Sequence, residues 1–249
     1  MKISIITVVY NNEKTLETAI QSVLSQTYEN IEYIIIDGAS TDGTLKIIDK
    51  YKDRIATIIS EPDAGIYDAM NKGISKATGD VIGILNSDDI YDDEHVINET
   101  MTSFANNPNI DMVYGDLVYV KNEDLNKVVR KWNSLKFYKN FFEDGNVPPH
   151  PSLFIRANLY KELGHFNLKY KLAADYEFML RAFKFKGDKS LYLNKLMVRM
   201  RLGGATNKSI KNIIKGNKEI LSAWKDNGLR APFFFMVKRF FKRVIQFIK

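Results

Sequence analysis

The chain of 249 residues contains no cysteine. This absence excludes disulfides, thiolate metal centres and a cysteine nucleophile, and it fits a protein that works in a reducing compartment. Histidine is also scarce, and three residues (His95, His150 and His165) are too few for us to expect an all-histidine metal site.

Long hydrophobic runs are missing as well. No stretch reaches the roughly 18 uncharged apolar residues of a membrane-spanning helix. The opening MKISIITVVY turns polar at once, without the cleavage pattern of a signal peptide. We expect a cytoplasmic protein that binds peripherally at the inner face of the cell membrane.

Several familiar motifs are absent. The first apolar run, Lys2–Val9, is followed by YNNEKT rather than by a G-x-G-x-x-G turn, and the chain has neither a P-loop nor a G-x-S-x-G elbow. These absences argue against a Rossmann dinucleotide enzyme, a P-loop NTPase and an α/β-hydrolase. A nucleotidyltransferase on a similar sheet would need a glycine-rich basic loop at the same place, so it is disfavoured too.

Negative charge is scarce at the C-terminal end. Residues 195–249 carry 14 lysines and arginines but only two acids, whereas the first 194 residues carry 22 basic and 28 acidic side chains. An acidic body with a basic tail predicts an anionic partner for the tail. A basic tail alone is a weak reason to expect nucleic acid, and we expect none.

The last segment, Pro232–Lys249, reads PFFFMVKRFFKRVIQFIK. Its apolar residues recur at three- and four-residue steps, with five basic residues and no acid between them. This pattern predicts a helix that lies in the plane of an anionic membrane surface. The alternative is a C-terminal helix that packs into the core.

Apolar runs alternate with amphipathic stretches through the first 85 residues. The runs are short and rich in Ile and Val, as buried parallel strands are, and the stretches between them show helical spacing. The predicted strands are Lys2–Val9, Ile31–Ile36, Ile55–Ser60 and Asp80–Leu85, and the predicted helices are 15–26, 44–51 and 66–78. This βαβαβαβ order predicts an α/β fold with a mostly parallel sheet flanked by helices.

Acidic residues follow the predicted strands where they end. Asp37 and Asp63 follow the second and third strands, and Asp88 and Asp89 follow the fourth. Right-handed crossovers bring these ends to one edge, so we expect these acids and Thr7 to line one crevice. Two adjacent carboxylates suit a divalent cation that is completed by substrate phosphates. Alternatively, they are loop acids or cap the helix that follows.

The second half of the chain is less regular. Met112–Val120 predicts a strand, a turn and a strand, and Pro151–Arg156 and Ser190–Met200 predict further strands. Ala174–Phe185 predicts a helix with Asp175 in its first turn, where the helix dipole favours a charged carboxylate. Asp175 is therefore either a cap or a carboxylate kept ionised as a general base.

Five segments together resemble glycosyltransferase family 2, in the family's order and over about residues 1–205. They are ISIITVVYNNEKTLETAIQSVLSQTYENIEYIIIDGASTDGT, EPDAGIYDAMNKGISKATGDVIGILNSDD, HPSLFIR, AADYEFMLR and RLGGAT. The resemblance implies a GT-A (Rossmann-like) fold, a nucleotide-sugar donor for which a UDP-sugar is expected, and Mn²⁺ or Mg²⁺. It also implies inverting transfer in bacterial surface-polysaccharide assembly, and the basic tail suggests that the acceptor is a glycan or polyprenyl-linked molecule at the membrane.

The resemblance further divides the chain into a glycosyltransferase domain and a tail. Residues 1–205 would form the domain, with a nucleotide-sugar half (1–110) and an acceptor half (111–205). Residues 206–249 would form a basic amphipathic tail. A non-catalytic sugar-nucleotide-binding subunit on the same fold is the alternative function, and the retention of Asp89 and Asp175 argues against it.

Roles for individual residues follow from the same resemblance. Asp175 would be the catalytic base, and Asp89, with Asp88, would coordinate the metal. The donor would be bound by Thr7, Tyr10, Asp37, Asp42, Asp63, Tyr67, Asn71, Lys72 and Asp88. The acceptor or the diphosphate would be bordered by His150, Arg181, Arg201 and Gly204. Many relatives carry aspartate where this chain has Asn86, so the sequence leaves open whether Asn86 contributes to the metal site.

Overall fold

The computed structural model describes residues 1–203 and 209–246. Its centre is one mixed sheet in the order β3-β2-β1-β4-β8-β6-β9-β5, with β7 paired to β6. The strands are β1 (Ile3–Val9), β2 (Ile31–Asp37), β3 (Thr57–Ser60), β4 (Val81–Ile84), β5 (Asp89–Tyr91), β6 (Met112–Val120), β7 (Val128–Trp132), β8 (Leu153–Arg156) and β9 (Ser190–Arg201). Strands β1 to β4 are parallel, as predicted, whereas β8 joins β4 in antiparallel orientation.

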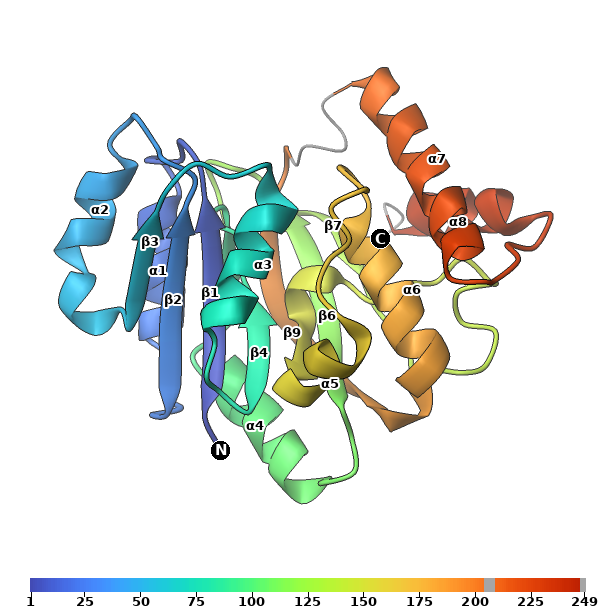
Figure 1. Ribbon diagram of the computed structural model, residues 1–249, viewed down its shortest axis with the longest axis horizontal. Helices are drawn as coiled ribbons and strands as arrows, with labels where there is room; N and C mark the ends of the chain where they lie inside the picture. The colour runs from blue at the N-terminus through green and yellow to red at the C-terminus, as the bar shows by residue number, and fades with distance from the viewer. Residues whose placement is uncertain (204–208, 247–249) are drawn as a thin grey trace.

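Helices cover both faces of the sheet (Figure 1). Strand β1 is buried along its whole length, because Ile3 and Ile5 face one layer while Ile6 and Val8 face the other. Helices α3 and α6 pack in the second layer, and α1 and α4 pack in the first. The helices are α1 (Leu16–Leu24), α2 (Thr44–Lys50), α3 (Ile66–Lys76), α4 (Val96–Asn106), α5 (Ala157–Leu163), α6 (Ala174–Lys186), α7 (Ile210–Asp226) and α8 (Phe235–Ile245). The predicted alternation of strands and helices is confirmed for the first four strands.

The turn predicted within Met112–Val120 is wrong, because the segment forms the single strand β6. Gly115 lies where the pairing of β6 with β9 shifts register. A Cβ atom at Gly115 would lie 2.5 Å from Met197 Sδ and 2.8 Å from the Lys195 carbonyl oxygen. The glycine therefore marks a close approach of two strands rather than a reversal of the chain.

Asp89 also differs from the expectation of an open loop. It is the first residue of the short strand β5, which pairs antiparallel with β9 and places Asp89 opposite Met200. A strand of three residues is too short for an alternation signal, and only its pairing with β9 defines it.

The C-terminal helices pack beside α6, at the upper right of Figure 1. Trp224 of α7 is buried, and its Nε1 donates a hydrogen bond to the Tyr176 hydroxyl of α6 at 2.9 Å. Phe235 of α8 packs edge-on against Trp224, with ring centroids 5.2 Å apart. Phe235 is the one buried residue of α8 and Met236 is partly buried against the core, so the core-packing alternative holds for one side of the helix, while Val237, Phe240, Phe241, Val244 and Ile245 are exposed. Within the described ranges, no helix is both long and apolar enough to cross a bilayer.

Candidate functional site

The loops at the carboxyl ends of β1, β2 and β4 are tied into one rim. Asn12 Nδ2 donates to Ser87 Oγ at 2.9 Å, and Thr15 Oγ1 donates to the Ser87 carbonyl at 3.0 Å. The Thr41 amide donates to Asn11 Oδ1 at 2.8 Å, and Asn11 adopts a left-handed φ of 48°, which asparagine tolerates. These contacts hold the strand-end loops together at the edge where the acids were predicted to meet.

Tyr10 and Asp63 lie against the backbone of Gly38, just beyond β2. A Cβ atom at Gly38 would lie 2.5 Å from Asp63 Oδ2 and 3.4 Å from Tyr10 Cδ2. The Tyr10 side chain is 64% exposed, and Asp63 Oδ1 accepts from the Gly65 amide at 2.8 Å. An exposed aromatic ring beside a carboxylate offers a flat surface and a hydrogen-bond acceptor for a heterocyclic base.

Asp37, the last residue of β2, is buried under this surface. Its Oδ2 accepts from the Ser40 amide at 3.0 Å and from Ser60 Oγ at 2.6 Å. Its Oδ1 has no hydrogen-bond partner among the described residues. Leaving a buried carboxylate oxygen unpaired costs free energy, so an N–H or O–H donor from a ligand would stabilise it.

Thr7 and Asp42 differ in how well they fit the donor pocket. The Thr7 side chain is fully buried and accepts a hydrogen bond from the Tyr33 hydroxyl at 3.1 Å, so the structure does not bring it to the surface where a base would bind. Asp42 accepts from the Thr44 amide at 2.9 Å and from the Glu13 amide at 3.1 Å. Hydrogen bonds, that from the Thr44 side chain first, hold the pKa of Asp42 below its usual value. Asp42 therefore supports the loop through these hydrogen bonds, and its predicted part in donor binding stays a prediction.

Asp89 is buried beside Asn86 and Asp88. Asn86 Nδ2 donates to Asp89 Oδ2 at 3.0 Å, while Asp89 Oδ1 and Asn86 Oδ1 are buried without hydrogen-bond partners among the described residues. Burial, and secondarily the charge of Asp88, raise the pKa of Asp89 well above its usual value. A cation at this position would relieve both the repulsion and the desolvation.

Arg201 lies under the acidic pair. Its Nη1 donates to the Asp88 carbonyl at 2.7 Å, and its Nη2 donates to Thr18 Oγ1 at 3.0 Å. Burial lowers the pKa of Arg201, and the charges of Asp88 and Asp89 oppose this shift. The side chain is only 5% exposed, so Arg201 organises the acidic loop from below.

The oxygen atoms of Asp88, Asp89 and Asn86 are the kind of ligands that Mg²⁺ and Mn²⁺ prefer. In the part of the chain that the structure describes, no group of three or more His, Asp or Glu side chains is arranged to hold a metal. The protein would therefore supply a partial shell of two carboxylates and an amide. Such a shell suits a cation that also binds substrate phosphates.

Asp175 lies in the first turn of α6 and is held by α3. The Tyr67 hydroxyl donates to Asp175 Oδ1 at 2.9 Å. Burial, and then the charge of Asp175, raise the pKa of Tyr67 well above its usual value, so Tyr67 remains a donor. The N-cap position of α6 is Ala173, and no side chain caps the helix there. The contact with Tyr67 thus accounts for Asp175 better than capping does.

His150 lies close to this carboxylate. Its ring packs edge-on against Phe166, with centroids 5.7 Å apart. Burial lowers the pKa of His150, and the negative charge of Asp175 opposes that shift. His150 is therefore a neutral imidazole near pH 7, and its predicted place beside the acceptor or diphosphate stays a prediction.

Three other predicted residues are engaged in the scaffold. The Asn71 side chain exchanges two hydrogen bonds of 2.9 Å with the backbone of Phe166. Lys72 Nζ contacts the Pro62 carbonyl and Glu61, each at 2.8 Å. Arg181 pairs with Glu177 at 3.0 Å and donates to the carbonyl groups of Leu163 and His165. The geometry gives these three side chains positioning roles, and Gly204 lies outside the described residues.

The contacts that build the rim were not predicted from the sequence. Asn12 and Ser87 are 75 positions apart, and each reads as an ordinary loop residue. The left-handed φ of 62° at Ala39 is equally hidden, since alanine rarely adopts it. Clusters of small polar residues after each strand were the available signal, and they do not specify partners.

Residues 4–164 match the family described as "Glycosyl transferase family 2". The chain is 31% identical over 182 residues to an "uncharacterized glycosyltransferase" of Mycobacterium tuberculosis, covering 72% of this chain and 68% of that protein. It is 28% identical over 183 residues to a PGL/p-HBAD biosynthesis glycosyltransferase of Mycobacterium bovis, covering 72% and 69% of the two chains.

Solved structures resemble the whole described fold. TarS of S. aureus (residues 1–349), in complex with UDP-GlcNAc, matches with a TM-score of 0.71 at 18% identity, covering 96% of this chain and 69% of that chain. The mannosyltransferase PcManGT of Pyrobaculum calidifontis, in complex with GDP-Man and Mn²⁺, matches with a TM-score of 0.65 at 16% identity, covering 95% and 68%. At these identities the likeness concerns the fold.

Proposed function

Because this chain belongs to glycosyltransferase family 2, we propose that it transfers a sugar, with inversion, from a UDP-sugar to a hydroxyl of a glycan or lipid-linked acceptor in surface-polysaccharide biosynthesis. The chain is a glycosyltransferase with the GT-A fold of its structural neighbours. We propose the identity of the donor, the metal, the general base and the acceptor, together with the contact with a membrane. We also propose that residues 1–205 form one domain, with halves at 1–110 and 111–205, and that residues 206–249 form a tail.

One observation carries the proposal. The sheet places Asp89 of the acidic pair opposite Met200 of β9, and Met200 opposite Tyr119 of β6. Burial raises the pKa of Tyr119, and the charges of both Asp89 and Asp175 add to the rise. A donor whose diphosphate lies at Asp89 would thus have its sugar within reach of Asp175.

The donor end of the crevice favours a base with N–H groups. Asp37 Oδ1 is unpartnered, and Tyr10 and Asp63 flank Gly38 above it. Uracil would stack on Tyr10 and donate to a carboxylate. Support for UDP also comes from two neighbours of the same fold, which are structures of TarS with UDP and with UDP-GlcNAc.

Asp88 and Asp89, with Asn86 beside them, would hold Mg²⁺ or Mn²⁺. When bound, the cation supplies a positive charge that stabilises the diphosphate as a leaving group. Support for this part comes from the unpartnered oxygens of Asp89 and Asn86 and from the neighbouring mannosyltransferase with Mn²⁺.

Asp175 would act as the general base. Tyr67 engages Oδ1, which leaves Oδ2 to accept the proton of the acceptor hydroxyl. As that proton leaves, the oxygen forms a bond to the anomeric carbon, and the bond from this carbon to the diphosphate oxygen breaks on the opposite face. The nucleoside diphosphate departs with the electron pair, and one displacement inverts the anomeric centre.

The tail is proposed to place the enzyme peripherally on the cytoplasmic face of a membrane. On α8, Phe240 is 63% exposed and Phe241 is 58% exposed, and Phe233 just before the helix is 94% exposed. These apolar side chains lie among Lys and Arg residues, as in helices that bind anionic membrane surfaces.

A donor screen tests the proposed activity. The purified protein is incubated with UDP-, GDP- and dTDP-sugars in the presence of Mn²⁺, with and without EDTA, and the release of nucleoside diphosphate is measured. We expect slow release from one UDP-sugar that EDTA abolishes. Release that EDTA leaves unchanged would contradict the metal site. Failure of UDP to bind in a calorimetric titration would contradict the donor assignment.

A further inference from the structure

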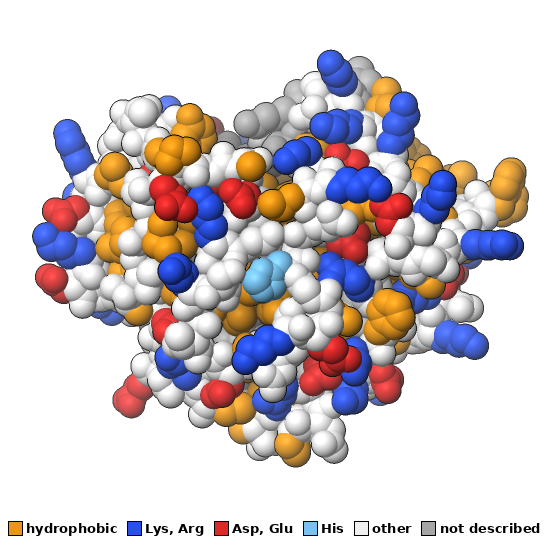
Figure 2. All heavy atoms as spheres, viewed as in Figure 1, with side chains coloured by type: hydrophobic (Ala, Val, Ile, Leu, Met, Phe, Trp, Pro, Cys, Tyr) orange, Lys and Arg blue, Asp and Glu red, His pale blue; other side chains and the backbone are white. Residues whose placement is uncertain are grey.

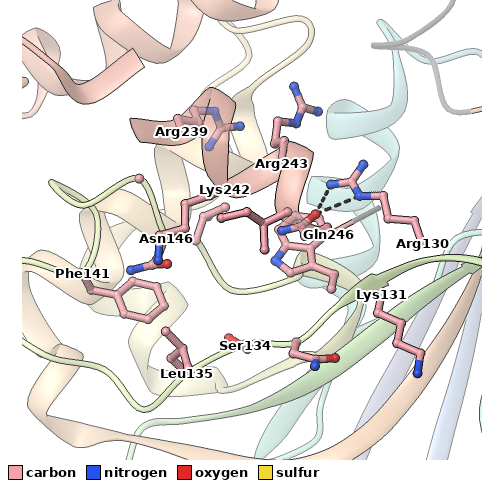
Figure 3. Close-up of a pocket in the computed structure, with 15 residues that line it drawn as sticks. Arg130, Lys131, Ser134, Leu135, Phe141, Asn146, Arg239, Lys242, Arg243 and Gln246 are labelled. Carbon is pink, nitrogen blue, oxygen red and sulfur yellow. Dashed lines mark hydrogen bonds between the residues drawn. The ribbon is translucent and has the colours of Figure 1, made fainter. Parts of the chain in front are cut away.

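A basic cavity lies outside the acidic crevice, between β7, residues 133–147 and α8 (Figure 3). Its volume is about 460 Å³, within the range of ordinary ligand pockets. The basic residues that line it are Arg130, Lys131, Arg239, Lys242 and Arg243, and none of its described lining residues is acidic. Figure 3 shows Arg130 turned toward Gln246 at the end of α8, with Arg239 and Arg243 projecting from the same helix.

Three of the five basic side chains that line this cavity come from α8. Among the described residues, Arg239, Lys242 and Arg243 form no ion pair, and the buried Nε of Arg239 has no hydrogen-bond partner. Burial lowers the pKa values of Arg130 and Arg239, and the charge of Arg243 lowers both further. Like charges gathered in a partly buried cavity favour the binding of an anion.

The arginines are held in place by packing against aromatic rings. The guanidinium of Arg130 lies 4.5 Å from the Tyr119 ring centroid, and its Nε donates to Gln246 Oε1 at 2.8 Å. The guanidinium of Arg239 lies 5.0 Å from the ring centroid of Tyr176. Planar guanidinium groups fixed in this way match the oxygens of phosphate.

An apolar surface continues from the cavity. A second cavity of about 350 Å³ shares Lys242 and Ile245 with the first, and Tyr138, Phe241 and the ion pair between Lys238 and Asp144 also line it. Beyond it lies the exposed apolar face of α8, formed by Val237, Phe240, Phe241, Val244 and Ile245. Figure 2 shows Lys and Arg side chains gathered over the part of the molecule where α7 and α8 lie, with hydrophobic side chains at its edge. A ligand with a phosphate and an apolar chain would match both surfaces.

The cavity is also within electrostatic reach of the acidic crevice. The positive charges of Arg130 and Arg243 act on Tyr119, as do the negative charges of Asp89 and Asp175. The charge of Asp175 acts on Arg239 in turn. Arg239 also packs on the ring of Tyr176, the residue that follows Asp175 in α6, so a phosphate bound at Arg239 would lie near the helical turn that carries the proposed base.

We propose that this basic cavity binds the phosphate or diphosphate of an amphiphilic acceptor whose apolar chain lies along the exposed face of α8. The acceptor role rests on the proposed function, whereas phosphate binding requires neither donor nor metal. The acceptor class is thus a lipid phosphate or diphosphate that carries the hydroxyl to be glycosylated.

The test is flotation of the full chain with phosphatidylcholine vesicles that contain either phosphatidic acid, which exposes a phosphate monoester, or phosphatidylserine. We expect the wild type to bind the vesicles with phosphatidic acid about tenfold more tightly than those with phosphatidylserine. The double substitution Arg239→Gln/Arg243→Gln should remove this preference. The matched control, Lys211→Gln/Lys215→Gln on the exposed side of α7, removes two charges outside the cavity and should retain it.

Two further variants separate the possible sources of a negative result. Lys242→Gln removes one charge and leaves the partly buried Arg239 in place, so it should weaken the preference even if the double variant folds poorly. Phe240→Ser/Phe241→Ser should weaken vesicle binding but leave calorimetric binding of inorganic diphosphate intact. The proposal would be overturned if the arginine variant and the lysine control lost the preference for phosphatidic acid equally. It would also be overturned if the serine variant bound both diphosphate and vesicles as tightly as the wild type does. If no donor sugar is turned over but the preference for phosphatidic acid vesicles is present, the result would count against the proposed function and not against the phosphate site.

Discussion

At the scale of single residues, the Tyr67–Asp175 contact links two helices that approach the crevice from different halves of the chain. The hydroxyl of Tyr67 donates to Oδ1 of Asp175 at 2.9 Å. The contact orients the carboxylate without neutralising it, because the raised pKa of Tyr67 keeps the proton on the phenol. Asp175 therefore remains able to accept a proton from a substrate.

Asp175→Asn is expected to lower metal-dependent donor turnover by about 10²–10⁴-fold, because an amide cannot accept the proton. The affinity for UDP, measured by calorimetry, should stay within a few-fold of the wild type. Tyr67→Phe is the matched control, since it keeps the carboxylate and removes one hydrogen bond, and it should cost far less turnover. Strong loss of UDP binding in Asp175→Asn would mean that Asp175 is structural.

The hydrogen bonds to Glu32 predict how the free energy of unfolding depends on pH. Burial opposes its ionisation, but hydrogen bonds from Ser4, from the amide and hydroxyl of Thr78, and from Lys2 outweigh burial and lower the pKa of Glu32 from 4.5 to about 2. A lowered folded-state pKa contributes stability above the unfolded value, and this stability is lost as the pH falls from 4.5 toward 2. These bonds join the start of β2 to β1 and to the residues before β4.

Glu32→Gln is therefore expected to lower the free energy of unfolding by about 2 kcal/mol at pH 7. The difference from the wild type should shrink toward pH 3, when urea unfolding is followed at both pH values. Glu29→Gln, at an exposed acid nearby, is the control and should show no such difference. A gap between Glu32→Gln and the wild type that is equal at both pH values would contradict the assignment.

At the scale of elements, α8 is fixed to the body of the protein along one side. Lys238 pairs with Asp144 at 2.8 Å, and the Lys131 amide donates to the Gln246 carbonyl at 3.1 Å. Gly145 lies directly against the helix backbone, because a Cβ atom there would lie 2.6 Å from the Arg239 nitrogen. The segment before α5 and the last helix of the described chain are thus packed as a unit.

Gly145→Ala is expected to lower the free energy of unfolding by about 2–4 kcal/mol, from a left-handed backbone penalty and from the clash with α8. Gly228→Ala is the matched control, since Gly228 also has a positive φ (69°) but has nothing within 4 Å of its Cβ position, and it should cost about 1 kcal/mol. Chemical denaturation measures both variants. Equal effects would mean that α8 does not rest on Gly145.

At the scale of the whole molecule, charge and apolar surface are gathered at the C-terminal end. Removing Pro232–Lys249 would also uncover Trp224, because Phe235 packs on it. Substitutions at exposed positions of α8 test membrane contact more cleanly, since they leave this packing in place.

Phe240→Ser/Phe241→Ser is expected to weaken binding to vesicles of phosphatidylcholine and phosphatidylglycerol by at least about tenfold. The two phenylalanines are 63% and 58% exposed, so little packing energy is lost. Phe185→Ser, at a residue of α6 that is 59% exposed, is the control and should leave flotation unchanged. Undiminished flotation of the α8 variant would remove the membrane surface from the proposed function.

Much of the fold was predictable because local patterns encode it. Apolar segments of six to eight residues predicted the first four strands and their parallel order, and the acids after them predicted the edge at which they end. The turn predicted within β6 is wrong because glycine also permits close packing of two strands. Strand β5 was not predicted because three residues are too few to show an alternation of apolar and polar side chains. The predicted basic amphipathic helix is present, and its apolar residues other than Phe235 are largely exposed.

By itself, the sequence determined the family, the α/β alternation, the acidic strand ends and the amphipathic tail, because each depends on residue type and short spacing. Only the tertiary structure decided which side chains meet. It placed Arg181 against the His165 carbonyl and buried Thr7 beneath the sheet edge. It also brought Arg130 beside Arg239 and Arg243, more than 100 positions away. Such meetings depend on the direction of each side chain and on packing between distant segments, which no local pattern specifies.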